Sequence, residues 1–238
     1  MTCRVCANIG NVRVAVGDRV GALAPYEESL AILRKVAATN PRNAEWQRDV
    51  SVSLVKIGNM RLAAGDRPGA LAAYEESLAI RRKLAATDPG NAGWQRDVGG
   101  SLIDVGDARL AAGDREGALA AYEESLAINR KLVAIDPGNA GWQRDVSLGL
   151  SRIGNAQLAA RNRERALAAY EEGLAIMRKL AAADSGNVDW QRELSVSLLG
   201  VGDVRLDAGD SDGALAAYAE SLTIMSKLAL ANLRNLEW

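Results

Sequence analysis

Residues 49–96 read DVSVSLVKIGNMRLAAGDRPGALAAYEESLAIRRKLAATDPGNAGWQR, and this stretch decides the fold because the rest of the chain repeats it. Every aromatic residue of the chain recurs with a spacing of 48 residues, at Tyr26, Tyr74, Tyr122, Tyr170 and Tyr218 and at Trp46, Trp94, Trp142, Trp190 and Trp238. A fixed period of this length is typical of proteins in which one unit cannot bury its apolar face alone and neighbouring units stack. We therefore expect both aromatic columns to belong to the core.

The repeat length organises the whole chain. We expect one elongated domain over residues 1–238, with repeats at about 1–48, 49–96, 97–144, 145–192 and 193–238. In each repeat the first helix carries apolar residues every three or four positions, as at Trp46, Val50, Leu54 and Ile57, which is one face of a 3.6-residue period. Gly65 is suited to end this helix in the left-handed conformation, and Asp66 to cap the next.

A second amphipathic helix follows the turn. Its apolar stripe is Ala70, Leu71, Tyr74, Leu78, Ile80 and Leu84. The run Asp88-Pro89-Gly90-Asn91 ends it, because the proline disfavours helical geometry at the preceding residue. Each helix should be about 20 residues and roughly 30 Å long. The sequence thus predicts an all-α chain of helix-turn-helix units.

Composition narrows the classes of partner. Charged residues make up 25% of the chain and the formal net charge is −1, which creates no overall field that attracts nucleic acid or an anionic membrane. No segment approaches 18 uncharged apolar residues, and the first residues contain no apolar core of a signal peptide. We expect a cytoplasmic protein that binds neither nucleic acid nor membranes.

The sequence offers few residues for a metal site or for catalysis. The two cysteines, Cys3 and Cys6, form a C-x-x-C run, but the chain has no histidine and no second cysteine pair, so it cannot form a closed zinc site from four Cys and His ligands. Cys6 aligns with Leu54, Leu102, Leu150 and Leu198, which indicates a core residue. Without a histidine base or a phosphate-binding glycine loop, we expect no enzyme and no cofactor.

The repeat resembles a tetratricopeptide repeat over essentially the whole chain. The matching residues are Ile57-Gly58 in the first helix, Gly65-Asp66 in the turn, and Ala70 and Tyr74 in the second helix. The usual unit has 34 residues, so both helices are about two turns longer here, similar to the long-helix repeats of kinesin light chains and of bacterial multi-repeat proteins. This resemblance implies a right-handed superhelical solenoid with the first helices lining a concave groove that binds peptides or partner helices.

One column in that implied groove keeps its chemical character. It consists of Asn11, Asn59, Asp107, Asn155 and Asp203. Short amides and carboxylates at regular intervals can hydrogen-bond the backbone of an extended peptide. The alternative is that each side chain bonds a neighbouring helix and fixes the stacking. The residues alone leave both interpretations open.

A neighbouring column, Lys56, Asp104 and Arg152, can supply charged contacts to a partner, although a solvated helix flank explains it equally well. Relatives that hold a carboxyl-terminal peptide add groove lysines as a carboxylate clamp. The matching positions here are Val55, Ile103, Ser151 and Leu199, which does not support a clamp. The leading hypothesis is a protein-protein interaction scaffold.

The second hypothesis is a self-associating structural solenoid. Apolar residues near the ends predict surface that a second copy can cover, either head to tail or as a dimer through the carboxyl-terminal end. They are Val5, Cys6 and Ile9 at one end and Leu222, Leu228, Leu230, Leu233 and Leu236 at the other. In addition, Met1 aligns with Asp49, and Trp238 is the residue that elsewhere opens the next repeat.

Overall fold

The structure is a computed structural model that describes residues 2–234, and within them ten α-helices. Met1, Leu236 and Trp238 lie outside the described residues, as do the side chains of Cys3 and Leu233. The all-α helical-repeat fold is confirmed. The helices are α1 (Thr2–Ala15), α2 (Leu23–Thr39), α3 (Ala44–Ala63), α4 (Arg67–Thr87), α5 (Ala92–Ala111), α6 (Arg115–Ile135), α7 (Ala140–Ala159), α8 (Arg163–Ala183), α9 (Val188–Asp207) and α10 (Ser211–Arg234).

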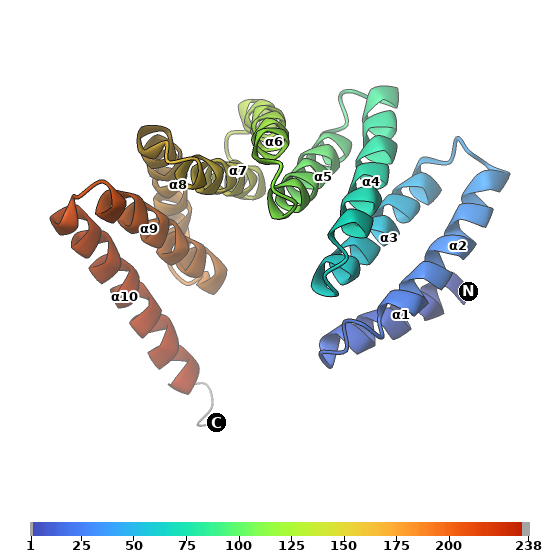
Figure 1. The fold of residues 1–238 in the computed structure, drawn as a ribbon, viewed down its shortest axis with the longest axis horizontal. Helices are drawn as coiled ribbons and strands as arrows, with labels where there is room; N and C mark the ends of the chain where they lie inside the picture. Colours follow the sequence, from blue (N-terminus) through green and yellow to red (C-terminus); the bar gives the residue numbers. More distant parts are fainter. Residues whose placement is uncertain (1, 235–238) are drawn as a thin grey trace. The chain divides into compact units, whose positions relative to one another are not determined.

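The chain divides into two compact units, which meet within α6 between Ile128 and Asn129. Within each unit, consecutive helices pack as antiparallel pairs, such as α3 with α4 and α9 with α10 (Figure 1). The odd-numbered helices are the first helices of the repeats and the even-numbered ones are the second. A single domain over 1–238 and a right-handed superhelix both stay predictions.

Each repeat is held together by a close approach of its two helices. Gly58 lies in the middle of α3, and a Cβ atom placed on it would be 2.4 Å from the Tyr74 ring. A glycine inside a helix costs about 1 kcal/mol relative to alanine, and here the cost is offset because the ring packs directly on the backbone of α3. Equivalent pairs recur with distances of 2.3 to 2.8 Å, at Gly10 and Tyr26, Gly106 and Tyr122, Gly154 and Tyr170, and Gly202 and Tyr218.

The predicted tyrosine core is buried at Tyr26, Tyr74, Tyr122 and Tyr170, whereas Tyr218 is half-buried. Tyr74 is 2% exposed and Cys6 is 6% exposed. Trp46, Trp94 and Trp190 are half-buried against the apolar clusters of their units. Their backbone amides also start the first helices, because the asparagine three residues earlier accepts a hydrogen bond from each, as Asn91 does from Trp94 at 3.0 Å.

Ion pairs between neighbouring repeats recur with fixed spacings. One column joins second helices over 42 residues: Arg34 to Glu76, Arg82 to Glu124, Arg130 to Glu172 and Arg178 to Glu220. Another joins a first helix to the preceding second helix over 34 residues: Arg61 to Glu27, Arg109 to Glu75 and Arg205 to Glu171. Exposed pairs of this kind contribute about 0 to 1 kcal/mol each. We therefore assign them a role in the register of stacking rather than a large share of stability.

The turn between the two helices follows one design in four repeats. Gly65 adopts φ +84°, and Asp66 then caps α4 by accepting a hydrogen bond from the Gly69 amide at 3.0 Å. A Cβ atom on Gly69 would lie 2.0 Å from the Asp66 carboxylate. The capping carboxylate would have to shift for any residue other than glycine at this position, and the same Asp and Gly pair occurs in repeats 1, 3 and 5.

The fourth repeat departs from this design. Arg161 occupies the left-handed position with φ 59°, Asn162 makes no side-chain cap, and Arg165 replaces the glycine. The three changes occur in one turn, where Arg165 meets no capping carboxylate at position 162. The turn keeps its backbone bond from the Asn162 amide to the Gln157 carbonyl at 2.8 Å.

Replacing Arg161 with glycine should stabilise the protein. A non-glycine residue in the left-handed region costs about 1 kcal/mol, so Arg161→Gly should raise the free energy of unfolding by about that amount in urea titrations. Arg165→Gly is the matched control, because it makes the same substitution at a residue of α8, where glycine is less favourable than arginine, and should not stabilise. An Arg161→Gly protein no more stable than the parent would contradict the assigned strain.

Candidate functional site

The column of short amides and carboxylates has an internal partner in every repeat. The Tyr74 hydroxyl donates a hydrogen bond to Asn59 Oδ1 at 2.7 Å. The same bond, always over 15 residues, joins Tyr26 to Asn11, Tyr122 to Asp107, Tyr170 to Asn155 and Tyr218 to Asp203, at 2.6 to 2.9 Å. The contact to a neighbouring helix that the sequence left as one of two alternatives is therefore present. It occupies one oxygen of each side chain.

These side chains also remain at the surface. Asn11, Asn59, Asn155 and Asp203 are exposed and Asp107 is half-buried. Each can offer its remaining amide hydrogens or oxygen lone pairs to a partner while it keeps the tyrosine bond. The structural role and a binding role are therefore compatible.

The neighbouring charged column contacts the tyrosine of the preceding repeat. The Lys56 ammonium lies 5.4 Å from the centre of the Tyr26 ring and donates a hydrogen bond to Asn11 Oδ1 at 3.1 Å. Burial, and then the charge of Asp104 in the next repeat, raises the pKa of the Tyr74 phenol. Arg152 is half-buried. The column therefore acts on the tyrosines of the preceding repeats at Lys56 and Asp104.

In the second unit, a pocket of about 370 Å³ brings several predicted site residues together. Arg152 and Asn155 from α7 and Asp203 from α9 line it, and Tyr170 and Met177 come from α8. Its remaining lining residues are Arg144, Ser147, Leu148, Ser151, Arg192, Glu193, Val196, Ser197, Leu199 and Gly200. The pocket thus lies between α7 and α9, which are two successive first helices, as expected for a groove lined by first helices. All of its lining residues belong to the second unit.

Gly200 shapes this pocket. It stands in the column of Lys56, Asp104 and Arg152 and brings no side chain. A Cβ atom on it would be 2.6 Å from Tyr170 Cε1, while a Cβ on Gly154 would be 2.8 Å from Cε2 of the same ring. Tyr170 is therefore held between two glycine backbones, and the charged cover that Lys56 gives Tyr26 is missing here.

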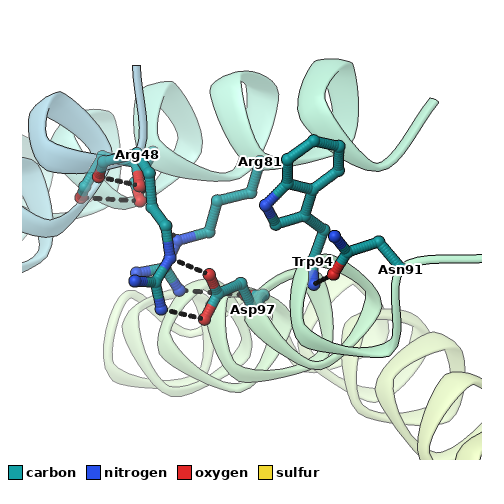
Figure 2. A network of polar contacts seen from close by, with 7 residues as sticks. Arg48, Arg81, Asn91, Trp94 and Asp97 are labelled. Carbon is teal, nitrogen blue, oxygen red and sulfur yellow. Dashed lines mark hydrogen bonds and ion pairs between the residues drawn. The ribbon is translucent and has the colours of Figure 1, made fainter. Parts of the chain in front are cut away.

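The corresponding surface of the first unit has a charged floor. Arg81 takes the place of Met177, and it donates hydrogen bonds to the Asp97 carbonyl at 2.9 Å and to Ser51 Oγ at 3.2 Å. Figure 2 shows Arg81 beside Arg48, whose guanidinium binds the Asp97 carboxylate with a shortest distance of 2.7 Å. Burial lowers the pKa of the Arg81 guanidinium. The same repeat position therefore holds the Arg81 guanidinium in the first unit and the Met177 thioether in the second.

Sequence reasoning missed three parts of this surface. The constant 15-residue spacing between the tyrosines and their Asn or Asp partners was a usable signal, but only the structure shows that the two side chains meet. Gly200 is the one residue of its column without a side chain, and a repeat-by-repeat comparison of that column could have found it. Met177 belongs to a column with Leu33, Arg81, Asn129 and Met225, in which the half-buried Arg81 is the only arginine.

Comparisons with known proteins support the repeat family. Residues 50–88 match the model of the tetratricopeptide repeat. No curated protein sequence matches the chain. Among the described residues, no helix is both long enough and apolar enough to cross a membrane.

Several solved structures have a similar fold. The structure of BtubC (BKLC) from P. vanneervenii has a TM-score of 0.71 and 20% identity, over 94% of this chain and 80% of that one. A kinesin light chain of Podosopora anserina with nearly identical tetratricopeptide-like repeats has a TM-score of 0.66 and 17% identity, over 95% of both chains. A Rap protein complexed with competence and sporulation factor has a TM-score of 0.64 and 12% identity, over 93% of this chain and 53% of that one. These matches confirm the resemblance to tetratricopeptide repeats.

The burial of Tyr74 should appear in the alkaline titration of its phenol. Burial, followed by the charges of Asp104 and Asp107, raises the pKa of this phenol from 10.0 to about 12. The unfolded chain therefore releases the proton first, and the stability from the neutral phenol is complete below pH 10 and is lost as the pH rises toward 12. The phenolate absorbance of the parent minus that of Tyr74→Phe should have its midpoint near pH 12. A midpoint near pH 10 would contradict the burial.

Proposed function

We propose that this helical-repeat protein is an interaction scaffold that binds a segment of a partner protein along the first helices of its repeats. The observation that carries the proposal is the pocket between α7 and α9, which collects Arg152, Asn155 and Asp203 beside exposed apolar side chains. The tetratricopeptide-repeat match and the Rap structure with a bound factor support a protein or peptide as the ligand. Nothing in the repeat pattern favours catalysis.

The column of Asn11, Asn59, Asp107, Asn155 and Asp203 serves both fold and binding in this proposal. One oxygen of each side chain accepts from tyrosine, and the remaining polar atoms face the ligand backbone at intervals set by the repeat. Lys56, Asp104 and Arg152 add charge beside it. The chain acts in the cytoplasm as one domain, without a cofactor and without binding nucleic acid or membranes.

Two matched sets of substitutions separate binding from stacking. Asn59→Ala, Asp107→Ala and Asn155→Ala together remove the polar groups, whereas Tyr74→Phe, Tyr122→Phe and Tyr170→Phe together remove the same hydrogen bonds but keep the polar groups. Each lost bond should lower stability by about 1 kcal/mol. We expect only the alanine set to weaken, by about tenfold or more, a partner first recovered by pull-down. Equal affinity of both sets would show that the column is structural only.

Self-association is the second candidate, and exposed leucines on α10 favour it. Leu222 is 68% exposed, whereas Leu174, its equivalent one repeat earlier, is 6% exposed. The same face carries Ala219 and Ser226 where earlier repeats have the glutamate and arginine of the ion-pair columns. A second copy that bound this face of α10 would therefore make apolar contacts, and it would not extend the ion-pair columns that join the earlier repeats.

Sedimentation of the protein over a range of concentrations tests this second candidate. If α10 forms a contact between copies, the average mass should rise with concentration, and Leu222→Glu should keep the protein monomeric because a carboxylate would have to be desolvated. Ala219→Glu, which restores the residue of the earlier repeats on the same exposed face, should act in the same direction. A monomer at every concentration would reject the candidate.

A further inference from the structure

The pocket between α7 and α9 has an apolar floor, whereas the equivalent surface between α3 and α5 in the first unit has Arg81 at the position of Met177. Met177 is 1% exposed and forms that floor together with the ring of Tyr170. Leu148, Val196 and Leu199 line the walls and keep 39%, 59% and 42% of their surface exposed. Exposed apolar side chains gathered around a concave site mark a place where a ligand buries apolar surface.

Several polar and charged groups of the lining are already engaged within the protein, and Arg192 pairs with Asp189 at 3.5 Å. Arg144 Nε donates to the Glu193 carboxylate at 2.6 Å. Asn155 accepts from the Tyr170 hydroxyl at 2.6 Å, and Asp203 accepts from the Tyr218 hydroxyl at 2.7 Å. A charged side chain entering the pocket would lose its water and find these groups occupied, which is unfavourable. The pairing of the lining charges therefore selects an uncharged occupant.

The first unit shows what the same scaffold does with a different floor. At the positions of Met177 and Gly200 it has Arg81 and Asp104, and Arg81 is hydrogen-bonded on the floor. Where the second unit has Val196 on the wall, the first has Gly100, around which a Cβ atom would meet nothing within 4 Å. An apolar side chain of a ligand that bound between α3 and α5 would cover the Arg81 guanidinium and the Asp104 carboxylate. It would also gain little contact with the wall, because Gly100 has no side chain.

We infer that the pocket between α7 and α9 binds one large uncharged apolar side chain of a partner protein segment, and that Gly200 and Met177 are its specificity-determining residues. The inference rests on the proposed function and adds the chemistry of the ligand. The segment lies across α7 and α9 with its anchor side chain against Met177 and Tyr170. Its backbone meets the remaining polar atoms of Asn155 and Asp203.

The chain itself provides the substitutions for a test. Met177→Arg with Gly200→Asp installs the floor of the first unit in the second, and Arg81→Met with Asp104→Gly installs the reverse. All four residues already occur at equivalent positions of this fold. Because an aspartate at position 200 requires the Tyr170 ring to move, Val196→Ser serves as an additional variant that alters only an exposed wall residue.

The probe is a random-peptide phage library selected on the complete 238-residue chain, followed by titration of the enriched peptides as synthetic compounds. We expect the enriched peptides to share one large aliphatic or aromatic residue. Replacing that residue with alanine, or using Met177→Arg with Gly200→Asp, should weaken binding by about tenfold or more, and Val196→Ser should weaken it less. Arg81→Met with Asp104→Gly should add a second binding site.

Methyl NMR spectra of the labelled protein locate the peptide. The inference predicts shifts at Leu148, Met177, Val196 and Leu199. Peptides that bind but shift only Val52 and Val55 of the first unit, or that bind the floor variant as tightly as the parent, would overturn the pocket inference and leave the proposed function standing. A selection without any peptide that binds the first helices would overturn both.

The same spectra recorded without peptide test a second copy as the occupant. If the four methyl signals shift with protein concentration alone, the pocket belongs to a contact between copies, and the inference of a partner protein is wrong. Unchanged signals over the concentration range of the peptide titration are the expected result.

Discussion

The packing of a second-helix tyrosine against a first-helix glycine is the constraint on which the rest of the structure depends. With Gly58 under Tyr74, the two helices approach more closely than any side chain at position 58 would allow. The hydroxyl then reaches Asn59, one residue after the glycine, and the pair closes with a hydrogen bond. Because the same contact recurs every 48 residues, it places a short polar side chain at the same point of every first helix. The candidate binding column is thus a consequence of the helix packing.

Repetition makes departures from the pattern informative. A repeat that keeps the glycine, the tyrosine and the polar partner can change other positions without altering the backbone, as Met177 and Arg81 show at one position. The side chain at the floor of the surface between successive first helices can therefore differ from repeat to repeat while the backbone stays the same. In the fourth repeat, by contrast, Arg161 accepts an unfavourable backbone conformation in a turn where glycine serves elsewhere. The hydrogen bond from Arg163 and the charges of Arg163 and Arg161 lower the pKa of the Asp207 carboxyl, so the Arg161 side chain acts on the first helix of the next repeat.

Most of the fold could be predicted from the sequence because its signals are local. The apolar period, the Gly-Asp turn and the Asp-Pro break act within one repeat, and repetition confirms each of them several times. The site was harder because its contacts are not local. The column of Asn59 and its equivalents was found as a pattern, but its tyrosine partner lies on another helix, and both residues vary too little to show that they interact. The pocket depends on Gly200, a residue whose effect is the absence of a side chain, and composition or period cannot reveal such an opening.

The engaged polar groups also bear on how a scaffold of this kind can be selective. If every Asn or Asp of the column were free, an extended backbone could bind equally well at any repeat, and the ligand could slide by one unit. The column alone therefore gives affinity without a fixed register. In the binding mode proposed above, the pocket between α7 and α9 removes this ambiguity, because an anchor side chain would bury its surface there, whereas the surface between α3 and α5 offers Arg81 and Asp104 at the matching positions. Uniform polar contacts and this pocket would then be complementary, and the repeat that lacks a side chain at position 200 would set the register of the ligand.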